Sequence, residues 1–285
     1  MDQKLNKVAA SANITAFNAE ASKNYLNDAP HLNHLVLRQL YQKLLVGVFD
    51  FASKHSTSPK VLDLGAGEGT ATLPFLELGA RVTAVDSSIS QLNVLRDKCE
   101  RFHGNLEVYC GDITEKLRNN RDTYDIIVCS SFLHHVPDYI GMIREAATLL
   151  PLHGQFFSFQ DPLRYDSVGK FTMMFTSFAY FSWRILQGDV LAGIRRRCRR
   201  NRGVYLADSI YDNSDYHVTR NGVDQNAIRR FLTEQGFNCD IISYFSTQSL
   251  FFQSFGEMLG LRNTFAVVAQ RRVVPVFRAA NNHGI

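Results

Sequence analysis

The chain has 285 residues, of which 45% are hydrophobic and 20% charged, and this balance is typical of a folded globular protein. Its formal net charge is +4 at pH 7, but the positive charge is concentrated in one short segment. That segment contributes six arginines: Arg195, Arg196, Arg197, Arg199, Arg200 and Arg202. Without these six charges the rest of the chain sums to −2, which argues against a broad basic face for nucleic acid.

Cysteine spacing and apolar runs exclude further classes of protein. The chain has five cysteines without Cys-x-x-Cys spacing, which predicts free thiols in a reducing compartment and no metal site. The first 17 residues lack an apolar signal core, so we expect a cytoplasmic protein. The longest uncharged apolar run, 171–183, has thirteen residues, whereas a membrane-spanning helix needs about twenty.

The first predicted element in the chain is a helix. After an opening loop, apolar residues recur at helical spacing from Leu32 to Val48, which predicts a helix with one buried face. We therefore assign residues 1–54 to an N-terminal helical cap.

Five short apolar runs then predict strands that are covered on both faces of a parallel sheet. These runs are Lys60–Leu64, Arg81–Asp86, Leu106–Cys110, Tyr124–Ser130 and Gln155–Gln160. Helical patterns separate the strands: Ser88 and Gln91 can form a capping box before one helix, and Ile140 to Leu150 carry the apolar face of another. Residues 55–163 are thereby predicted to form an α/β core.

Residues 164–221 interrupt this alternation. Nearly sixty residues are too many for a structureless loop, so we expect a helical insertion that lies over one end of the sheet as a lid for a substrate. Its first half holds eight large apolar residues between Phe171 and Trp183. They would either bury the insertion's own helix against the sheet edge or line a substrate pocket.

The last part of the chain resumes the core pattern. Asp224–Gln235 predicts a helix, and Cys239–Phe245 and Thr264–Gln270 predict two closing strands. Residues 222–272 would therefore complete the core, and residues 273–285 would form a tail. The whole order predicts an α/β fold with a doubly wound, mostly parallel seven-stranded sheet.

The stretch VLDLGAGEGT, Val61 to Thr70, joins the first predicted strand to a glycine-rich loop. Glycines at 65 and 67 allow tight dihedral angles and close approach of a ligand, although a glycine-rich turn can also exist without one. Asp86 and Asp112 follow the second and third strands at the same edge of the sheet. A glycine loop with carboxylates at these two strand ends predicts a nucleoside site.

The spacing of the loop disfavours a dinucleotide. The pyrophosphate motif is Gly-x-Gly-x-x-Gly, but here the third glycine comes one residue early and Thr70 takes its place. Asp63 and Glu68 beside the loop would repel phosphates and suit a cationic ligand.

The motifs together resemble the class I S-adenosylmethionine-dependent methyltransferases, in order and with normal spacing from Ser56 to Phe159. The matching segments are VLDLGAGEG, VTAVDSS, YCGDI, YDIIVCSSFLHHVPD and LLPLHGQFFSF. The resemblance implies a Rossmann-like methyltransferase fold, and it implies S-adenosyl-L-methionine as the methyl donor. An Asn/Asp-Pro-Pro-aromatic motif, which would favour methylation of DNA bases, is missing after the fourth strand, where the chain has Cys-Ser-Ser-Phe.

The resemblance also implies which residues hold the donor. Gly65 and Gly67 would lie against its methionine part, Asp86 would bind the ribose, and Asp112 with Ile113 would hold the adenine. Ser130 and Ser131 would lie near the sulfonium, and the same site would include Asp63, Ala66 and Ser87. Tyr25 lies in an N-terminal segment, Phe17–Tyr25, that resembles one closing over the donor in relatives; packing at the surface is the alternative.

Two histidines are candidate bases. An oxygen acceptor usually needs a base, and histidine titrates in the useful range. His135 matches a histidine common in the family, but it could equally pack or hydrogen-bond the cofactor loop. His134 is predicted to be structural, and His217, just before the last predicted helix, is the alternative base.

These features predict O-methylation of a small, amphipathic acceptor such as a quinone, lipid-linked, sugar or natural-product intermediate. The arginine segment Arg195–Arg202 has three interpretations: a solvated helical face, a contact with anionic lipid or a phosphorylated acceptor, and a contact with nucleic acid. Two alternative functions follow. One is an RNA methyltransferase that uses these arginines, and the other is a donor-binding protein without transfer activity.

Overall fold

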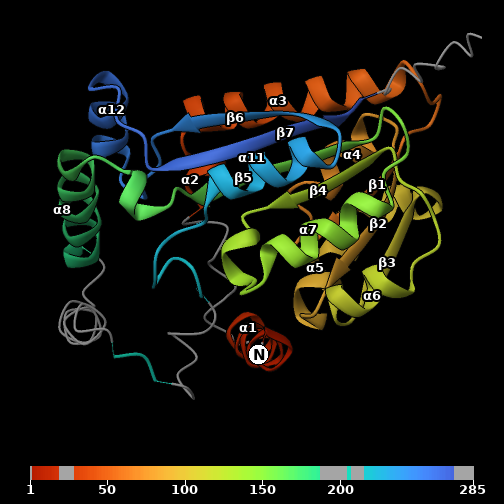
Figure 1. Cartoon of the computed structure of the whole chain (residues 1–285), viewed down its shortest axis with the longest axis horizontal. Coiled ribbons are helices and arrows are strands. Elements are labelled where there is room, and N and C mark those ends of the chain that lie inside the picture. The colour runs from red at the N-terminus through yellow and green to blue at the C-terminus, as the bar shows by residue number, and fades with distance from the viewer. Residues whose placement is uncertain (1, 19–28, 187–203, 207–214, 273–285) are drawn as a thin grey trace, which may run out of the picture.

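A computed structural model describes residues 2–18, 29–186, 204–206 and 215–272. Seven strands form one sheet in the order β3-β2-β1-β4-β5-β7-β6, with helices on both faces (Figure 1). All pairs are parallel except those of β7, which runs antiparallel to both β5 and β6. The structure therefore confirms the predicted doubly wound, mostly parallel seven-stranded sheet.

The strand positions agree closely with those predicted from the sequence. The strands are β1 Lys60–Leu64, β2 Arg81–Asp86, β3 Leu106–Cys110, β4 Ile126–Ser130, β5 Gln155–Pro162, β6 Phe237–Tyr244 and β7 Thr264–Arg271. The first three match the predicted bounds residue for residue. The central strands are buried on both faces, so their apolar runs are continuous and end where burial ends.

Ten described helices surround the sheet. They are α1 Asp2–Asn18, α2 Pro30–Asn33, α3 Leu35–Ser53, α4 Thr72–Glu77, α5 Ile89–Lys98, α6 Ile113–Asn119, α7 Tyr139–Thr148, α8 Lys170–Leu186, α11 Gln225–Glu234 and α12 Leu250–Met258. Three short 3₁₀ turns add η3 Glu100–Asn105, η4 Leu133–His135 and η5 Tyr165–Ser167. In the described part of the chain, no helix combines the length and the apolar content needed to cross a bilayer.

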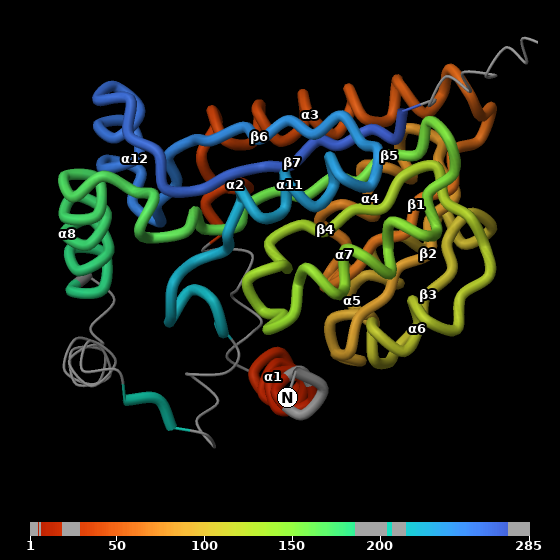
Figure 2. Tube along the Cα trace, in the orientation of Figure 1, coloured from red at the N-terminus to blue at the C-terminus, as the bar shows by residue number. Residues whose placement is uncertain are grey.

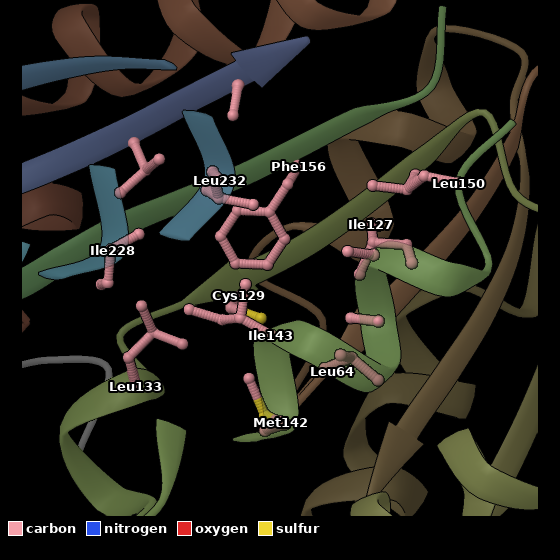
Figure 3. Packing of buried hydrophobic residues seen from close by; sticks show 14 of the residues in the cluster. Leu64, Ile127, Cys129, Leu133, Met142, Ile143, Leu150, Phe156, Ile228 and Leu232 are labelled. Atoms are coloured by element: carbon pink, nitrogen blue, oxygen red, sulfur yellow. The ribbon is translucent and has the colours of Figure 1, made fainter. Parts of the chain in front are cut away.

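Two hydrophobic layers sandwich the sheet. Consecutive residues of β5 face opposite sides, so Phe156 joins the layer under α7 and α11 while Phe157 joins the layer under α3, α4 and α5. Figure 3 shows the first layer, in which the ring of Phe156 lies beside the side chains of Ile127 and Leu232. Burying both faces fixes the register of the strands and thus the relative heights at which they end.

Two helices were missed from the sequence. The expected opening loop is wrong, because residues 2–18 form α1, which packs on α5 and η4. Helix α12, between β6 and β7, was not predicted at all. Neither helix buries a broad apolar stripe against the sheet, so the spacing of hydrophobic residues gave little signal for them.

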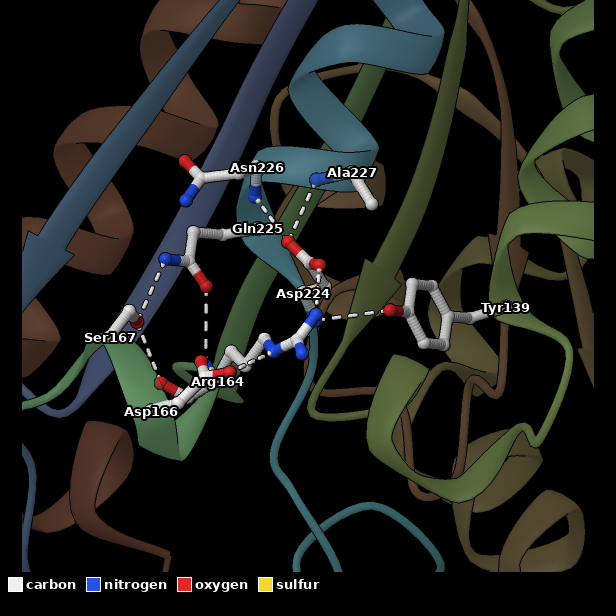
Figure 4. Close-up of polar contacts among 8 residues, drawn as sticks. All are labelled: Tyr139, Arg164, Asp166, Ser167, Asp224, Gln225, Asn226 and Ala227. Carbon is white, nitrogen blue, oxygen red and sulfur yellow. Dashed lines mark hydrogen bonds and ion pairs between the residues drawn. The ribbon is translucent and has the colours of Figure 1, made fainter.

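The two ends of the 164–221 segment are held together at the edge of the core. Pro162 O accepts from Val223 N at 3.0 Å, and Asn221 O accepts from Tyr165 N at 2.8 Å. Arg164 Nη1 lies 2.6 Å from Asp224 Oδ2 in the polar network that Figure 4 shows. The two described ends of the segment are therefore fixed to β5 and to the start of α11. The division of the chain into a cap, a core, an insertion and a tail stays a prediction.

Gly222, inside this closure, should not tolerate a side chain. Its φ is +72°, and a Cβ atom there would lie 2.1 Å from Leu163 O. We expect Gly222→Ala to lower the free energy of unfolding by more than the roughly 1–2 kcal/mol that left-handed backbone costs other residues. Gly79→Ala is the control in urea unfolding, since Gly79 has φ +98° but nothing within 4 Å of a Cβ. Equal losses in the two variants would contradict a steric role for Leu163.

Candidate functional site

A cavity opens at the carboxyl ends of β1, β2 and β4, the edge where ligands bind in open α/β sheets. It holds about 800 Å³ of empty space, including the part that opens to solvent. Ten of the residues predicted from the sequence line it: Asp63, Gly65, Ala66, Gly67, Asp86, Ser87, Ile113, Ser130, Ser131 and His135. The fold therefore gathers residues that are up to 72 positions apart in the chain around one space.

The glycine loop is tied to the neighbouring strand. Gly65 N and Ala66 N both donate to Val85 O of β2, at 2.9 and 3.1 Å. Gly65 has φ +74°, and a Cβ atom there would lie 2.2 Å from the Phe132 ring. Gly67 has φ +52° and only Gln91 within 4 Å of such an atom. Gly65 thus makes room for a side chain of the protein, and Gly67 leaves room for a ligand.

Asp86 links the loop to the following helix. Its Oδ2 accepts from Gly67 N at 2.9 Å and its Oδ1 accepts from Ser88 N at 2.8 Å. Desolvation raises the pKa of Asp86, and these backbone hydrogen bonds act in the opposite direction. Each carboxylate oxygen keeps a second lone pair, so the group can accept hydrogen bonds from two ligand hydroxyls without losing its own structural bonds.

Asp63 sits beneath the loop and is almost completely buried. Its Oδ2 accepts from Thr72 Oγ1 at 2.6 Å, while its Oδ1 has no partner within the described residues. Burial raises its pKa to about 7, against the hydrogen bond from Thr72. The other loop acid, Glu68, is paired with Lys98 at 2.6 Å. Both acids were predicted to favour a cationic ligand. Asp63 offers such a ligand a buried oxygen atom without a hydrogen bond, whereas the charge of Glu68 is already neutralised by Lys98.

The N-terminal helix reaches the mouth of the cavity. Phe17 contacts His135 edge-on, with ring centroids 5.5 Å apart. Asn18 Oδ1 accepts from Ser88 Oγ at 2.7 Å and from Ser90 Oγ at 2.8 Å. Both residues begin the segment predicted to close over the ligand; Tyr25, its predicted contact, lies outside the described residues.

Asp112 does not line the cavity. It is the N-cap of α6, and its Oδ1 accepts from Glu115 N at 2.9 Å. Its neighbour Ile113 does line the cavity and offers an apolar surface at that end. An adenine contact by Asp112 stays a prediction.

His134 is paired with a buried carboxylate, and its structural role stays a prediction. Asp161 Oδ1 accepts from His134 Nδ1 at 2.8 Å and from its backbone N at 3.1 Å. A bulge in β5, with Gln160 at φ +69°, breaks the register just before Asp161 and can re-aim its side chain. Desolvation raises the pKa of Asp161, and His134 acts in the opposite direction. This pair anchors η4 and thereby fixes the position of His135.

His135 faces the cavity from η4 and is buried. Its Nδ1 lies 3.7 Å from Asp215 Oδ1, a residue of the segment that precedes α11. His134, His135 and Asp215 each place a ligand atom within 4.8 Å of the others, the one such metal-binding arrangement among the described residues. A neighbouring carboxylate would stabilise an imidazolium at His135. The expectation that the protein has no metal stays a prediction.

His217 lies beside the cavity but does not line it. Its Nε2 is 3.0 Å from Val136 O, and a carbonyl can only accept, so this nitrogen carries the proton. Burial lowers its pKa to about 4. Its backbone N also donates to His134 O at 2.9 Å. These contacts hold the 215–222 turn against η4, and they leave only Nδ1 for a role as base.

Comparisons with known proteins agree with this geometry. Residues 61–154 match the model of a family described as a methyltransferase domain. These residues resemble a methyltransferase domain. The ubiquinone biosynthesis O-methyltransferase of Coxiella burnetii is 38% identical over 97 residues, which are 34% of this chain and 41% of that protein. The chain thus matches less than half the length of this relative.

Solved structures show the same fold over most of the chain. The magnesium protoporphyrin IX methyltransferase of Synechocystis, solved with bound SAH, has a TM-score of 0.54 at 14% identity and covers 92% of this chain and 99% of its own. The [4+2]-cyclase SpnF has the same TM-score at 13% identity, covering 96% and 97%. The predicted class I methyltransferase fold is therefore confirmed, and it also occurs in a protein named for another reaction.

The sequence did not reveal several residues of the cavity. His31 lines it, is 3% exposed, and has no hydrogen-bond partner for either ring nitrogen within the described residues. Asn13 and Phe132 also contribute to the lining. The helix α2 that carries His31 is only four residues long, and no motif marks it. Only its packing against Tyr41 of α3 and Phe159 of β5 brings it to the site.

Asp63 should make stability depend on pH. The folded protein keeps this proton up to about pH 7, whereas an exposed aspartate releases it near pH 4. Between these values the folded state binds more protons, so the Asp63 contribution to the free energy of unfolding falls as pH rises. We expect Asp63→Asn to remove this fall and to be more stable than wild type at pH 8. Urea unfolding at several pH values measures it, with the exposed Asp97→Asn as control. A constant difference between wild type and Asp63→Asn would refute the argument.

Proposed function

We propose that this protein transfers a methyl group from S-adenosyl-L-methionine to an oxygen atom of a small, amphipathic acceptor. The single observation that supports it most is the cavity, where an open glycine loop, Asp86 and Ile113 lie at one edge of the sheet. The similarity to a relative named an O-methyltransferase supports oxygen as the acceptor atom. A quinone, lipid-linked, sugar or natural-product intermediate fits this class.

The residues of the cavity suit each part of the donor. Asp86 would accept from the ribose hydroxyls while it keeps its bonds to the loop. Ile113 would pack against the adenine, and Ser130 with Ser131 would lie near the sulfonium. The unused Oδ1 of Asp63 would accept from the ammonium of the methionine part, a charge that would lower the pKa of Asp63 again.

The bound donor would supply an activated methyl group, so the protein must align the acceptor, exclude water and accept a proton. His135 faces the cavity and is the residue we propose as the base. As it takes the acceptor proton it becomes an imidazolium, which Asp215 at 3.7 Å would stabilise. The buried pair of His134 and Asp161 would hold the η4 turn while this charge forms. Phe17 covers the His135 ring and would limit access of water.

Two alternatives remain in view. One is a donor-binding protein without methyl transfer; the same fold in a [4+2]-cyclase supports keeping it, since fold does not determine function. An RNA methyltransferase would need the arginines of Arg195–Arg202, which lie outside the described residues. We propose instead that these arginines contact anionic lipid or a phosphorylated acceptor, and that the protein acts in the cytoplasm at a membrane surface.

Asp86 should be essential for donor binding. We expect Asp86→Ala to weaken binding of S-adenosylmethionine or its demethylated product by about 1–3 kcal/mol, because the ribose hydroxyls lose a charged acceptor. Isothermal titration calorimetry measures this, and Asp97→Ala, a change on the exposed face of α5, should bind normally. Because Asp86 also holds the glycine loop, circular dichroism must show that the variant is folded. Unchanged affinity in a folded variant would refute the proposed donor site.

His135 should limit turnover rather than donor binding. We expect His135→Gln to keep donor affinity and to lower kcat by roughly 10²–10⁴-fold, the usual contribution of a general base. The wild-type rate should fall at acid pH, where a protonated imidazole cannot accept a proton, and the variant should lose this dependence. Asp215→Asn should reduce kcat less, and the exposed His103→Gln should leave it unchanged. A variant with weak donor binding and normal kcat at saturation would instead assign His135 to the cofactor loop.

A further inference from the structure

Helices α8 and α12 lie side by side at one end of the sheet, away from the glycine loop (Figure 2). Their inner faces pack together: Phe175 of α8 contacts Phe252 of α12 at 5.9 Å and Phe245 at 5.8 Å between ring centroids. Ala179 is fully buried behind them. The expectation that the apolar half of the insertion packs against the core is therefore correct for this face only.

The outer faces of the same two helices are apolar and exposed. Their large side chains are each more than two fifths exposed: Phe171, Met174, Phe178 and Ile185 on α8, and Leu250, Phe251, Phe255 and Met258 on α12. On α8 the spacing is i, i+3, i+7 and i+14, which places all four on one side of the helix. We call these eight residues the outer apolar surface. They line neither the cavity nor the core.

Isolated exposed apolar residues need no explanation, but a contiguous set on two adjacent helices marks an interaction site. The two rows are joined through Phe252 of α12, whose ring contacts Phe178 at 5.5 Å and Phe251 at 5.3 Å. Apart from Phe178, the outer side chains take no part in the packing of Phe175 against Phe245 and Phe252. The outer apolar surface is therefore available to a partner.

The charges around this surface indicate its partner. Helix α8 contains no acidic residue, and it carries Lys170 at its start and Arg184 near its end. Arg262 follows α12 and is exposed. The single acid of α12, Glu257, accepts a hydrogen bond from Gln253 at 2.7 Å. Next along the chain from α8 comes the arginine segment 195–202. An apolar face bordered by cations suits an anionic bilayer, whereas two copies of it would repel each other.

We propose that the outer apolar surface of α8 and α12 docks on an anionic lipid bilayer, with its side chains entering the boundary between headgroups and acyl chains. Lys170, Arg184 and Arg262 contact the headgroups. The docking adds a binding surface to the protein and does not depend on methyl transfer.

A tryptophan on the outer apolar surface would report this contact. Trp183, the only tryptophan in the sequence, lies five residues after Phe178 and therefore on another side of α8. We therefore use the variant Phe178→Trp, Trp183→Phe, whose single tryptophan lies on the surface. On adding vesicles of phosphatidylcholine with phosphatidylglycerol, we expect its fluorescence to shift to the blue and to be quenched by lipids with brominated acyl chains. Vesicles of phosphatidylcholine alone should bind at least tenfold more weakly, and added salt should reduce binding to the anionic vesicles.

Charged substitutions separate the surface from the rest of the molecule. The triple variant Met174→Glu, Phe251→Glu and Met258→Glu should lose vesicle binding at least tenfold, as measured by cosedimentation, and keep its far-ultraviolet circular dichroism. The control pair Val36→Glu and Leu152→Glu changes exposed apolar residues elsewhere and should bind normally.

Three results would overturn the proposal. One is normal vesicle binding by the triple variant. This result would overturn the proposal even if changing Arg195, Arg196, Arg197, Arg199 and Arg200 to glutamine abolished vesicle binding. The second is no change in the tryptophan fluorescence of the Phe178→Trp, Trp183→Phe variant with either vesicle. The third is a dimer in sedimentation analysis that the triple variant abolishes, which would make a second copy the partner.

Discussion

Parallel pairing of β1 with both β2 and β4 is the constraint on which the candidate site depends. Leu64 pairs with Val85 on one side, and Asp63 pairs with Val128 on the other, so all three strands end at the same edge. The bonds from the glycine loop to Val85 O and Asp86 add to this pairing. Since the strands are buried on both faces, a shift of register would expose their apolar residues. The geometry of the cavity is therefore maintained by the hydrophobic core.

Three carboxylates lie near the carboxyl ends of β1, β2 and β5: Asp63 and Asp161, which are buried, and Asp86, which is half-buried. Burial disfavours the charge on each and raises all three pKa values. Asp86 and Asp161 offset part of this cost by holding the glycine loop and the η4 turn. Asp63 keeps one oxygen unused. Such incompletely compensated groups are typical of sites where a ligand completes the hydrogen bonds.

The two ends of the molecule serve different purposes in our proposals. The cavity lies at the carboxyl ends of β1, β2 and β4, and its residues determine which donor can bind and which atom can lose a proton. Helices α8 and α12, at the end of the sheet to the left in Figure 1, present apolar side chains that the fold does not use. A lipophilic acceptor would be concentrated at a membrane to which these helices bind. The common fold with a cyclase is a reason to test chemistry and docking separately.

The sequence by itself determined the sheet and much of the cofactor cavity. Strands covered on both faces leave continuous apolar runs. Site residues such as Gly65 and Asp86 lie at the ends of these runs or directly after them, so local pattern was enough. Tertiary structure alone decided which distant groups meet. It brought His31 and Phe17 to the cavity, paired His134 with Asp161 across 27 residues, and set Asp215 beside His135. The tertiary structure also decided which face of α8 is buried, because an apolar helix buries the side that meets a neighbouring element. Here that neighbour is α12, a helix that the sequence pattern did not predict.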